Sequence, residues 1–258
     1  MLTFTDQIGH KISLEKTPER IISIVPSQSE FLWDIGLRDE LVGITKFCIH
    51  PDEMYRHVER VGGTKELDLE KIQRLKPDLI IGNKEENSED QIKILQKEFP
   101  VWMSDIYSFD DSFKMMRELG ILLGKEKESE RIINKIEKIL PAIKNKFPGQ
   151  RVAYFIWNKP YMTAAKHTFI DHVLNYVGFK NVCGNLERYP ELSSDDLIKL
   201  NPELCLLSSE PFPFREKHVS ELQAILPKAK IKIVDGEVFS WYGSRLLNLA
   251  DYLENFAI

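Results

Sequence analysis

Several features that define whole classes of protein are missing from this 258-residue sequence. No stretch approaches 18 consecutive apolar residues, so no segment is predicted to span a membrane. The three cysteines, Cys48, Cys183 and Cys205, are odd in number and show no CxxC spacing, which argues against a disulfide framework and a zinc knuckle. The motifs GxGxxG, GxxxxGKS/T, HExxH and GxSxG do not occur either. Nucleotide binding, zinc proteolysis and serine hydrolysis are therefore not predicted.

An excess of basic residues is also missing. The chain has 35 Lys and Arg against 40 Asp and Glu, a formal net charge of −5, so nucleic acid is not a predicted partner. The first residues, Met1 to Gly9, contain neither the basic n-region nor the apolar h-region of a signal peptide. Taken alone, these facts predict a cytoplasmic protein with an ordinary hydrophobic core, since 43% of its residues are hydrophobic.

The patterns that are present predict an α/β fold. Short apolar runs rich in β-branched residues alternate with segments of helical spacing, as in βαβ units with parallel sheets. The runs lie at residues 21–25, 41–44, 79–82, 101–103, 152–156, 204–207 and 231–234. The alternation breaks once, where isoleucine and leucine at helical spacing predict one long helix over residues 126–147, kinked at Pro141. This helix either packs on one domain or links two lobes.

An internal repeat favours two lobes. Residues 70–81 align without gaps on residues 195–206, and each copy has an acid in the first turn of a short helix, a proline that ends the helix, another acid and a buried strand. A looser match pairs residues 31–39 with 173–181, where each helix ends at a glycine suited to the left-handed C′ position. Both matches predict two similar lobes separated by the long helix.

The turn after the strand at 21–25 contains two serines that could be taken for nucleophiles. Its sequence, Pro26-Ser27-Gln28-Ser29-Glu30, lacks the glycines that close approach to a pyrophosphate requires. Ser27 and Ser29 are instead predicted as helix N-caps, with Ser27 and Glu30 at the spacing of a capping box. Because no nucleophile stands beside a base, we predict no catalysis.

Polar residues follow several predicted strands, and ligands bind at the carboxyl ends of strands in open α/β sheets. Asn83-Lys84-Glu85-Glu86-Asn87 either orients a ligand or is a solvated charged run. Gly62-Gly63-Thr64-Lys65 allows close backbone approach or forms a simple turn. Cys48 and His50 could bind a soft or borderline metal, but no second cluster completes a site, so we favour a loop without metal.

Large aromatic residues in predicted loops of both lobes suit a flat or bulky ligand, although core packing explains aromatics equally well. They are Trp157, Tyr161, Tyr189, Trp241 and Tyr242. Two acids, Glu70 and Asp195, occupy equivalent places in the repeat. They either complement the helix dipole or pair with arginines of a partner.

At this point the sequence resembles a known family, the substrate-binding proteins of ABC importers for metal chelates, namely ferric siderophores, haem and cobalamin. The resemblance covers nearly the whole chain and depends on the order of residues 20–30, 69–80 and 238–246. It is nearest to the cobalamin-binding subgroup, where Trp157-Asn158-Lys159-Pro160-Tyr161 and Tyr189-Pro190 fall at pocket aromatics. Thr64 and Asn83 stand where that subgroup would carry tryptophans, and Trp241 where it would carry an arginine, which argues against cobalamin itself. The polarity of residues 47–51, 62–65 and 83–87 suggests a more charged ligand.

The resemblance implies a class III periplasmic binding protein fold, with two parallel-sheet α/β lobes bridged by a single long helix and ligand in the cleft. The expected domains are an N-terminal lobe at 1–107, a helical segment at 108–148 and a C-terminal lobe at 149–258. Glu70 and Asp195 match the acids that dock on permease arginines. The expected ligand-binding residues are Phe47, His50, Lys65, Glu85, Trp157, Tyr161, Tyr189, Trp241, Tyr242 and Arg245.

Our main hypothesis is a monomeric, non-enzymatic receptor that has no cofactor of its own, binds a metal chelate and delivers it to a permease at the membrane surface. The alternatives are a cytoplasmic chelate-handling enzyme or metallochaperone on the same scaffold, and an interaction module with a vestigial pocket. The family location is periplasmic or at the membrane surface, so either a signal peptide has been removed or this member works in the cytoplasm. We favour removal.

Overall fold

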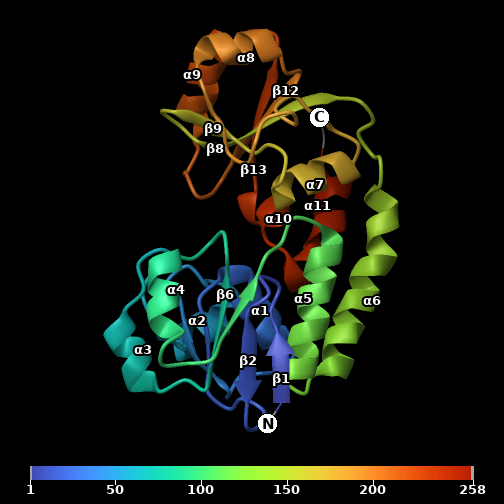
Figure 1. Cartoon of the computed structure of the whole chain (residues 1–258). Helices are drawn as coiled ribbons and strands as arrows, with labels where there is room; N and C mark the ends of the chain where they lie inside the picture. Colours follow the sequence, from blue (N-terminus) through green and yellow to red (C-terminus); the bar gives the residue numbers. More distant parts are fainter. Residues whose placement is uncertain (1, 257–258) are drawn as a thin grey trace. The chain divides into compact units, whose positions relative to one another are not determined.

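The computed structural model describes residues 2–256, and the chain divides into two compact units (Figure 1). Unit 1 comprises Met1–Ile106, Asp110–Ile136 and Tyr242–Arg245. Unit 2 comprises Tyr107–Phe109, Glu137–Trp241 and Leu246–Ile258. The chain therefore returns to unit 1 for one short segment near its C-terminus.

Unit 1 is built on a five-stranded sheet in which every neighbouring pair is parallel. Strands β3, β4, β6 and β7 are almost entirely buried, which explains their continuous apolar runs. The hairpin β1–β2 precedes the sheet. In the order β5-β4-β3-β6-β7, and with the hairpin last, the strands are β5 (Glu59–Arg60), β4 (Leu41–Ile44), β3 (Ile21–Ser23), β6 (Leu79–Asn83), β7 (Val101–Ser104), β1 (Leu2–Thr5) and β2 (Lys11–Leu14).

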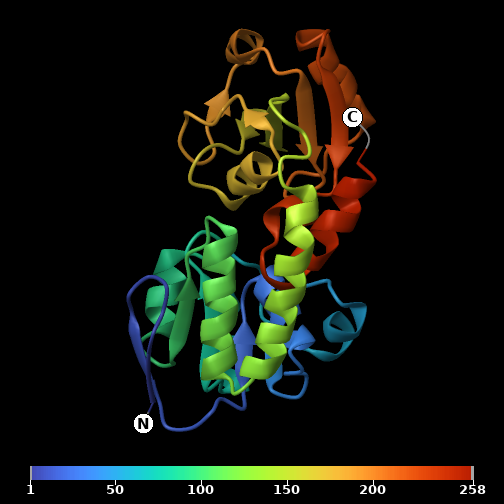
Figure 2. The same cartoon turned by 90° about the vertical axis from the view of Figure 1, so that its right-hand side faces the viewer.

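Helices surround this sheet. They are α1 (Pro26–Asp34), α2 (Asp52–His57), α3 (Leu69–Leu75), α4 (Glu89–Leu95), α5 (Phe109–Leu122) and the first part of α6 (Glu126–Ile143). Ile72 of α3 and Ile92 of α4 pack with Ile80 of β6 in one apolar cluster, which attaches these two helices to the sheet. Figure 2 shows α5 and α6 side by side, where Ser129 Oγ donates to the carbonyl of Met116 at 2.6 Å.

Unit 2 has a second sheet with the order β11-β9-β8-β12-β13, and β10 pairs with β8. Its strands are β8 (Arg151–Trp157), β9 (Tyr161–Thr163), β10 (Lys180–Asn181), β11 (Glu191–Leu192), β12 (Leu204–Ser208) and β13 (Lys230–Val234). Its helical elements include α7 (Phe169–Tyr176), α8 (Ser194–Leu200), α9 (Glu216–Ile225), α10 (Gly236–Ser240) and α11 (Leu249–Glu254). The 3₁₀ segment η1 (Gly243–Asn248) begins in unit 1 and ends in unit 2.

The predicted α/β class with parallel sheets is confirmed, with one difference in unit 2. Strands β8, β12, β13 and β10 are parallel, but β9 runs antiparallel to β8 and β11 antiparallel to β9. The reason lies in the connection from β8 to β9, which is only residues 158–160. A parallel neighbour needs a crossover of a dozen or more residues, so a connection this short forces an antiparallel turn.

The long helix α6 links the units, as predicted. It belongs to unit 1 up to Ile136 and to unit 2 from Glu137 onward. It ends at Ile143 rather than at the predicted residue 147. Pro141 lies in its last turn, where the missing N–H removes an intrahelical hydrogen bond, and the helix stops two residues later.

The internal repeat is present in the structure as two matching helices, α3 and α8. Each has seven residues, with Glu70 or Asp195 second in the helix. Each ends at a residue in the left-handed conformation, Lys76 (φ 47°) or Asn201 (φ 45°), which is followed by a proline and then by β6 or β12. The aligned letters therefore correspond to one supersecondary unit used twice.

An arginine outside the aligned letters extends this correspondence. Arg20, just before β3, donates from Nη2 to the carbonyl of Leu75 (2.5 Å) and from Nε to that of Lys76 (3.3 Å). Arg151, which begins β8, donates to the carbonyls of Leu200 and Asn201 in the same way. In both units the acid after the proline accepts from the arginine's own backbone N–H, at 2.9 Å for Asp78 and 3.1 Å for Glu203. Each arginine satisfies carbonyls that a helix end leaves without partners.

The looser match is confirmed at the ends of α1 and α7. Gly36 (φ 87°) and Gly178 (φ 93°) both adopt the left-handed conformation. Beyond each glycine, the next N–H donates back into the helix, from Leu37 to Leu32 and from Phe179 to Leu174. This is the Schellman pattern that glycine favours at C′.

The capping box predicted for α1 is wrong. The N-cap is Val25, and Pro26 is the first helical residue, so the helix begins before Ser27. Proline favours this first position because its missing N–H would have no partner there. Ser29 Oγ instead donates to the carbonyl of Val25 at 2.8 Å, inside the helix. A capping box does occur on α8, between Ser193 and Asp196.

Candidate ligand-binding site

The loop 83–87 begins at Asn83, the last residue of β6, and is held by its own two asparagines, Asn83 and Asn87. Asn83 Oδ1 accepts from the N–H groups of Glu85 (2.8 Å) and Glu86 (3.1 Å), while its Nδ2 donates to Ser104 Oγ at 2.9 Å. Asn87 Oδ1 accepts from the N–H of Asn83 at 2.8 Å. Both asparagines are buried, and their side-chain amides are hydrogen-bonded. These bonds fix the backbone conformation of the loop where it leaves the sheet.

Lys65 fastens this loop to the neighbouring turn. Its Nζ donates to the carbonyls of Glu85 (2.5 Å) and Asn87 (3.3 Å). Asn87 Nδ2 returns a bond to the carbonyl of Thr64 at 3.0 Å. Gly62 makes the turn possible, because it has φ 99° and a Cβ there would lie 2.4 Å from the carbonyl oxygen of Glu66. The structure thus brings Lys65 and Glu85 together, with the Lys65 ammonium engaged on backbone carbonyls.

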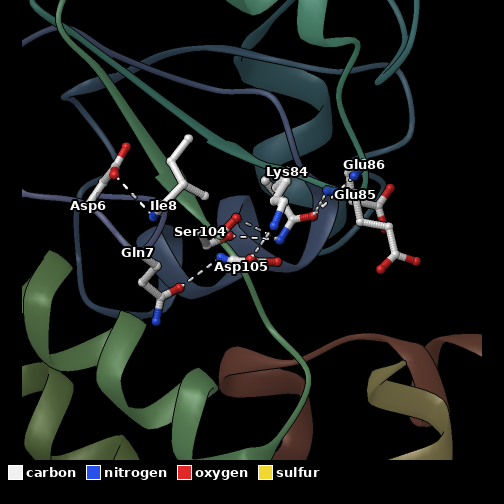
Figure 3. A network of polar contacts seen from close by, with 9 residues as sticks. Asp6, Gln7, Ile8, Lys84, Glu85, Glu86, Ser104 and Asp105 are labelled. Carbon is white, nitrogen blue, oxygen red and sulfur yellow. Dashed lines mark hydrogen bonds and ion pairs between the residues drawn. The ribbon is translucent and has the colours of Figure 1, made fainter. Parts of the chain in front are cut away.

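Two carboxylates are presented by this loop. In Figure 3 the side chains of Glu85 and Glu86 extend away from Ser104 and Asp105. Glu85 is half-buried and Glu86 is exposed. Burial raises the pKa of Tyr242, and the charges of Glu86 and Glu85 add to that increase.

Tyr242 lies in a buried polar cluster of unit 1 that sequence reasoning missed. Gln28 Nε2 donates to Ser104 Oγ at 2.5 Å and contacts the Tyr242 hydroxyl at 3.4 Å. Gln28 is fully buried, and its Oε1 has no hydrogen-bond partner among the described residues. The available signal was the position of Gln28 in the first turn of α1, just beyond the carboxyl end of β3, which is where ligand crevices form.

Arg245 follows Tyr242 closely but has a different environment. Its Nε donates to Glu30 Oε2 of α1 at 2.9 Å, and the two side chains are only 11% and 13% exposed. A charge-assisted bond in such a position is well shielded from water. The pair attaches the returning segment 242–245 to α1, so the structure gives Arg245 a structural partner within unit 1.

The loop after β4 carries Phe47, Cys48 and His50. Phe47 is 49% exposed, with Lys46 Nζ 5.2 Å from its ring centroid, and His50 is half-buried. Cys48 is fully buried, with its Sγ 3.2 Å from Ser29 Oγ and 3.1 Å from Thr45 Oγ1. Burial raises the pKa of the Cys48 thiol, which disfavours the thiolate that a metal requires. No cluster of three or more His, Cys, Asp or Glu side chains that could hold a metal occurs among residues 2–256.

The strand ends of unit 2 carry an aromatic ledge, which we define as Trp157, Phe212 and Phe214. Trp157 ends β8, is 41% exposed and lies 5.5 Å, centroid to centroid, from Phe212. Phe212 follows β12 and lies 4.8 Å from Phe214. Sequence reasoning selected Trp157 but missed Phe212. The signal was Pro211-Phe212-Pro213, an aromatic fixed between two prolines directly after a strand.

The other predicted aromatics of unit 2, Tyr161, Tyr189 and Trp241, each contact a different protein group. Tyr161 of β9 is half-buried and meets Phe155 edge to face, with ring centroids 6.0 Å apart. Tyr189 is half-buried, and the Arg188 guanidinium lies 6.0 Å from its ring centroid. Trp241 is buried and donates from Nε1 to Glu210 Oε1 at 2.8 Å. Burial raises the pKa of Glu210, and the bond from Trp241 opposes that shift.

The two docking candidates are equivalent in the structure. Glu70 and Asp195 are exposed on the first turns of α3 and α8. Asp196, the neighbour of Asp195, is engaged instead in the capping box with Ser193, which lowers its pKa. Within the described part of the chain, none of the helices has the length and apolar character needed to cross a bilayer.

Comparison with known proteins identifies one family and several relatives that this chain resembles. The model of a family described as periplasmic binding protein matches residues 21–225. A Bacillus subtilis protein named an uncharacterized ABC transporter substrate-binding lipoprotein, YvrC, is 28% identical over 213 residues, or 78% of this chain and 67% of its own. A vitamin B12-binding protein of Vibrio parahaemolyticus is 27% identical over 195 residues, or 74% of this chain and 70% of its own.

Solved structures share the fold. The periplasmic catecholate-siderophore binding protein VctP of Vibrio cholerae superposes with a TM-score of 0.79 at 17% identity, covering 99% of both chains. At 17% identity this similarity shows a shared fold, and the shared fold extends over nearly the whole chain.

Proposed function

Because the chain belongs to the periplasmic binding protein family, we propose that it is a receptor that captures a metal chelate and delivers it to the permease of an ABC importer. The observation that carries this proposal is the family match over residues 21–225. It is supported by relatives named as an ABC transporter substrate-binding lipoprotein and as a vitamin B12-binding protein. Cobalamin and catecholate siderophores, the ligands named for these relatives and neighbours, are both metal-binding molecules of considerable size.

The ligand contacts come from the strand ends of each unit. In unit 2 the aromatic ledge offers Trp157 and Phe212 to a flat or bulky ligand. In unit 1 the loop 83–87 offers the carboxylates of Glu85 and Glu86, and the loop after β4 offers Phe47 and His50; the polarity of these loops favours a ligand with polar or charged groups. We retain Tyr161, Tyr189, Trp241, Tyr242 and Arg245 as proposed contacts, although their present partners are protein groups.

The receptor carries out no chemistry on its ligand and has no cofactor of its own. The alternative of a metallochaperone depends on Cys48, which is fully buried and has a raised pKa. A thiol in that condition is a poor ligand for a metal that must enter and leave. We propose a monomer acting in the periplasm or at the membrane surface, with Glu70 and Asp195 as its contacts to the permease.

The test is a titration with cobalamin, haem and a ferric catecholate, followed by tryptophan fluorescence and by chromatography of the released ligand. We expect one chelate to bind tightly and to be recovered unchanged. Trp157→Ala should weaken that binding about tenfold, since stacking on an aromatic contributes about 1–1.5 kcal/mol. The control is Ile121→Ala, which removes an exposed apolar side chain from α5. Recovery of a modified product, or retention of bare Zn²⁺ or Co²⁺, would contradict the receptor.

A further inference from the structure

The turn of the hairpin β1–β2 contacts β7, the edge strand next to β6, and the loop 83–87 follows β6. Strand β7 is the last strand of the unit 1 sheet, so it pairs with β6 on one side and has no neighbouring strand of that sheet on the other. Asp6 Oδ2 accepts from the N–H of Met103 in β7 at 3.1 Å, and Gln7 N–H donates to the carbonyl of Met103 at 3.1 Å. The hairpin turn therefore covers the open edge of β7.

The side chain of Gln7 extends this contact past the end of β7 (Figure 3). Its Oε1 accepts from the N–H of Asp105 at 3.1 Å, and its Nε2 donates to the carbonyl of Asp111 at 2.9 Å. Asp105 is the first residue after β7, and Asp111 is in the first turn of α5. One amide thus holds both ends of the connection from β7 to α5.

Asp105 in turn holds the start of the loop 83–87. Its Oδ2 lies 2.7 Å from Lys84 Nζ, and the N–H of Lys84 donates to the carbonyl of Ser104 at 2.9 Å. The Asp105 side chain is only 18% exposed but that of Lys84 is 56% exposed, so water screens this ion pair in part, and the backbone bond from Lys84 to Ser104 reinforces it. Lys84 immediately precedes Glu85, and Figure 3 shows the two side by side on one loop.

We infer that Gln7 is a positioning residue of the ligand-binding site: it fixes Asp105, Asp105 fixes Lys84, and Lys84 fixes the loop that presents Glu85 and Glu86. The inference rests on the proposed function, because only that function makes the loop a ligand contact. Lys65 holds the far side of the same loop through the carbonyls of Glu85 and Asn87. The hairpin therefore adds a support to those that Asn83, Asn87 and Lys65 already give the loop.

The test is amide hydrogen exchange of the ligand-free protein, which needs no knowledge of the chelate. In Gln7→Ala the amides of Glu85 and Glu86 should exchange about fivefold faster, as expected for the loss of a supporting hydrogen bond. Lys84→Met should have a similar effect, and the double variant should do no more than either single one, because both lie on one chain of contacts. Ser13→Ala, on the exposed face of β2, should leave these amides unchanged.

Exchange at Glu85 and Glu86 that stays at the wild-type rate in both Gln7→Ala and Lys84→Met would overturn the inference. So would full additivity in the double variant. If Gln7→Ala fails to fold, the variants Lys84→Met and Asp105→Asn replace it, and the exchange rates of the Glu85 and Glu86 amides in the single and double variants are compared in the same way. If the amides respond as expected but no chelate binds, the proposed function fails while the positioning role stands. A structural role alone would lower the Tm and speed exchange throughout unit 1 rather than in the loop.

Discussion

Units 1 and 2 hold their exposed acids in the same way and build their strand ends differently. Helices α3 and α8 match residue by residue, down to the arginine that caps each one and the left-handed residue that ends it. The strand ends share no such match, because unit 1 has a polar loop fixed by asparagines and Lys65, whereas unit 2 has the aromatic ledge.

Under the proposed function, this difference separates permease docking from ligand binding. A partner that meets both units benefits from equivalent acids at equivalent places, and the repeat supplies them. A ligand without internal symmetry is served better by two unlike surfaces. We therefore expect changes in the repeated helices to act alike in both units, and changes at the strand ends to act differently.

The largest effect is expected for Glu70 and Asp195, the proposed docking acids. The double variant Glu70→Ala/Asp195→Ala should reduce permease-dependent chelate uptake at least about tenfold, because each acid would lose a charge-assisted contact of about 1.5–3 kcal/mol. Binding of the chelate in solution should stay unchanged. Asp196→Ala is the matched control, since that acid is engaged in its own helix cap. Uptake that survives in the double variant would show that the two acids are not the docking contacts.

The two C′ glycines should differ in cost despite the same conformation. A Cβ at Gly36 would meet nothing within 4 Å, whereas at Gly178 it would lie 3.0 Å from Cα of Asn145 and 3.2 Å from the carbonyl carbon of Phe147. Gly36→Ala should therefore lower the free energy of unfolding by about 1 kcal/mol through backbone strain alone. Gly178→Ala should cost about 3 kcal/mol, because overpacking adds to that strain. Urea denaturation measures both, and equal values would contradict the assigned packing.

The arginine caps should behave as a pair. Arg20→Ala and Arg151→Ala each remove hydrogen bonds to two carbonyls at the end of α3 or α8. Both sites are at least partly exposed, so each variant should lose about 1 kcal/mol of unfolding free energy, and the two losses should agree within about 0.5 kcal/mol. Hydrogen exchange should accelerate in α3 only for the first variant and in α8 only for the second. Arg56→Ala, whose ion pair with Asp52 is on the surface, serves as the control.

The smallest effect is expected for Lys65, an exposed side chain that is one of several groups holding the polar loop. Lys65→Met keeps the length of the side chain and removes its bonds to two carbonyls, so it should cost about 0.5–1 kcal/mol. Lys166→Met in unit 2 removes a surface ion pair with Glu187 and should cost less. Thermal unfolding compares them. A larger loss for Lys166→Met would mean that Lys65 does not support its loop.

Sequence reasoning predicted what local pattern determines and missed what distant contacts determine. The apolar strand runs, the linking helix and the repeat all depend on neighbours along the chain. Strands β9 and β11 escaped notice because they have three and two residues, too few to show a period. The engagement of Lys65 with the carbonyls of Glu85 and Asn87 could not be predicted, since it joins residues some twenty positions apart. Phe212 could have been found, because two flanking prolines mark a fixed loop.

Native mass spectrometry of the protein purified from its source tests the central claim most directly. If the protein is a chelate receptor, the spectrum will show one additional mass that corresponds to a metal chelate, and unfolding will release that mass intact. The same spectrum taken after Trp157→Ala should show less of it. A bare metal ion retained at fixed stoichiometry, or a bound molecule that is released chemically altered, would contradict the account.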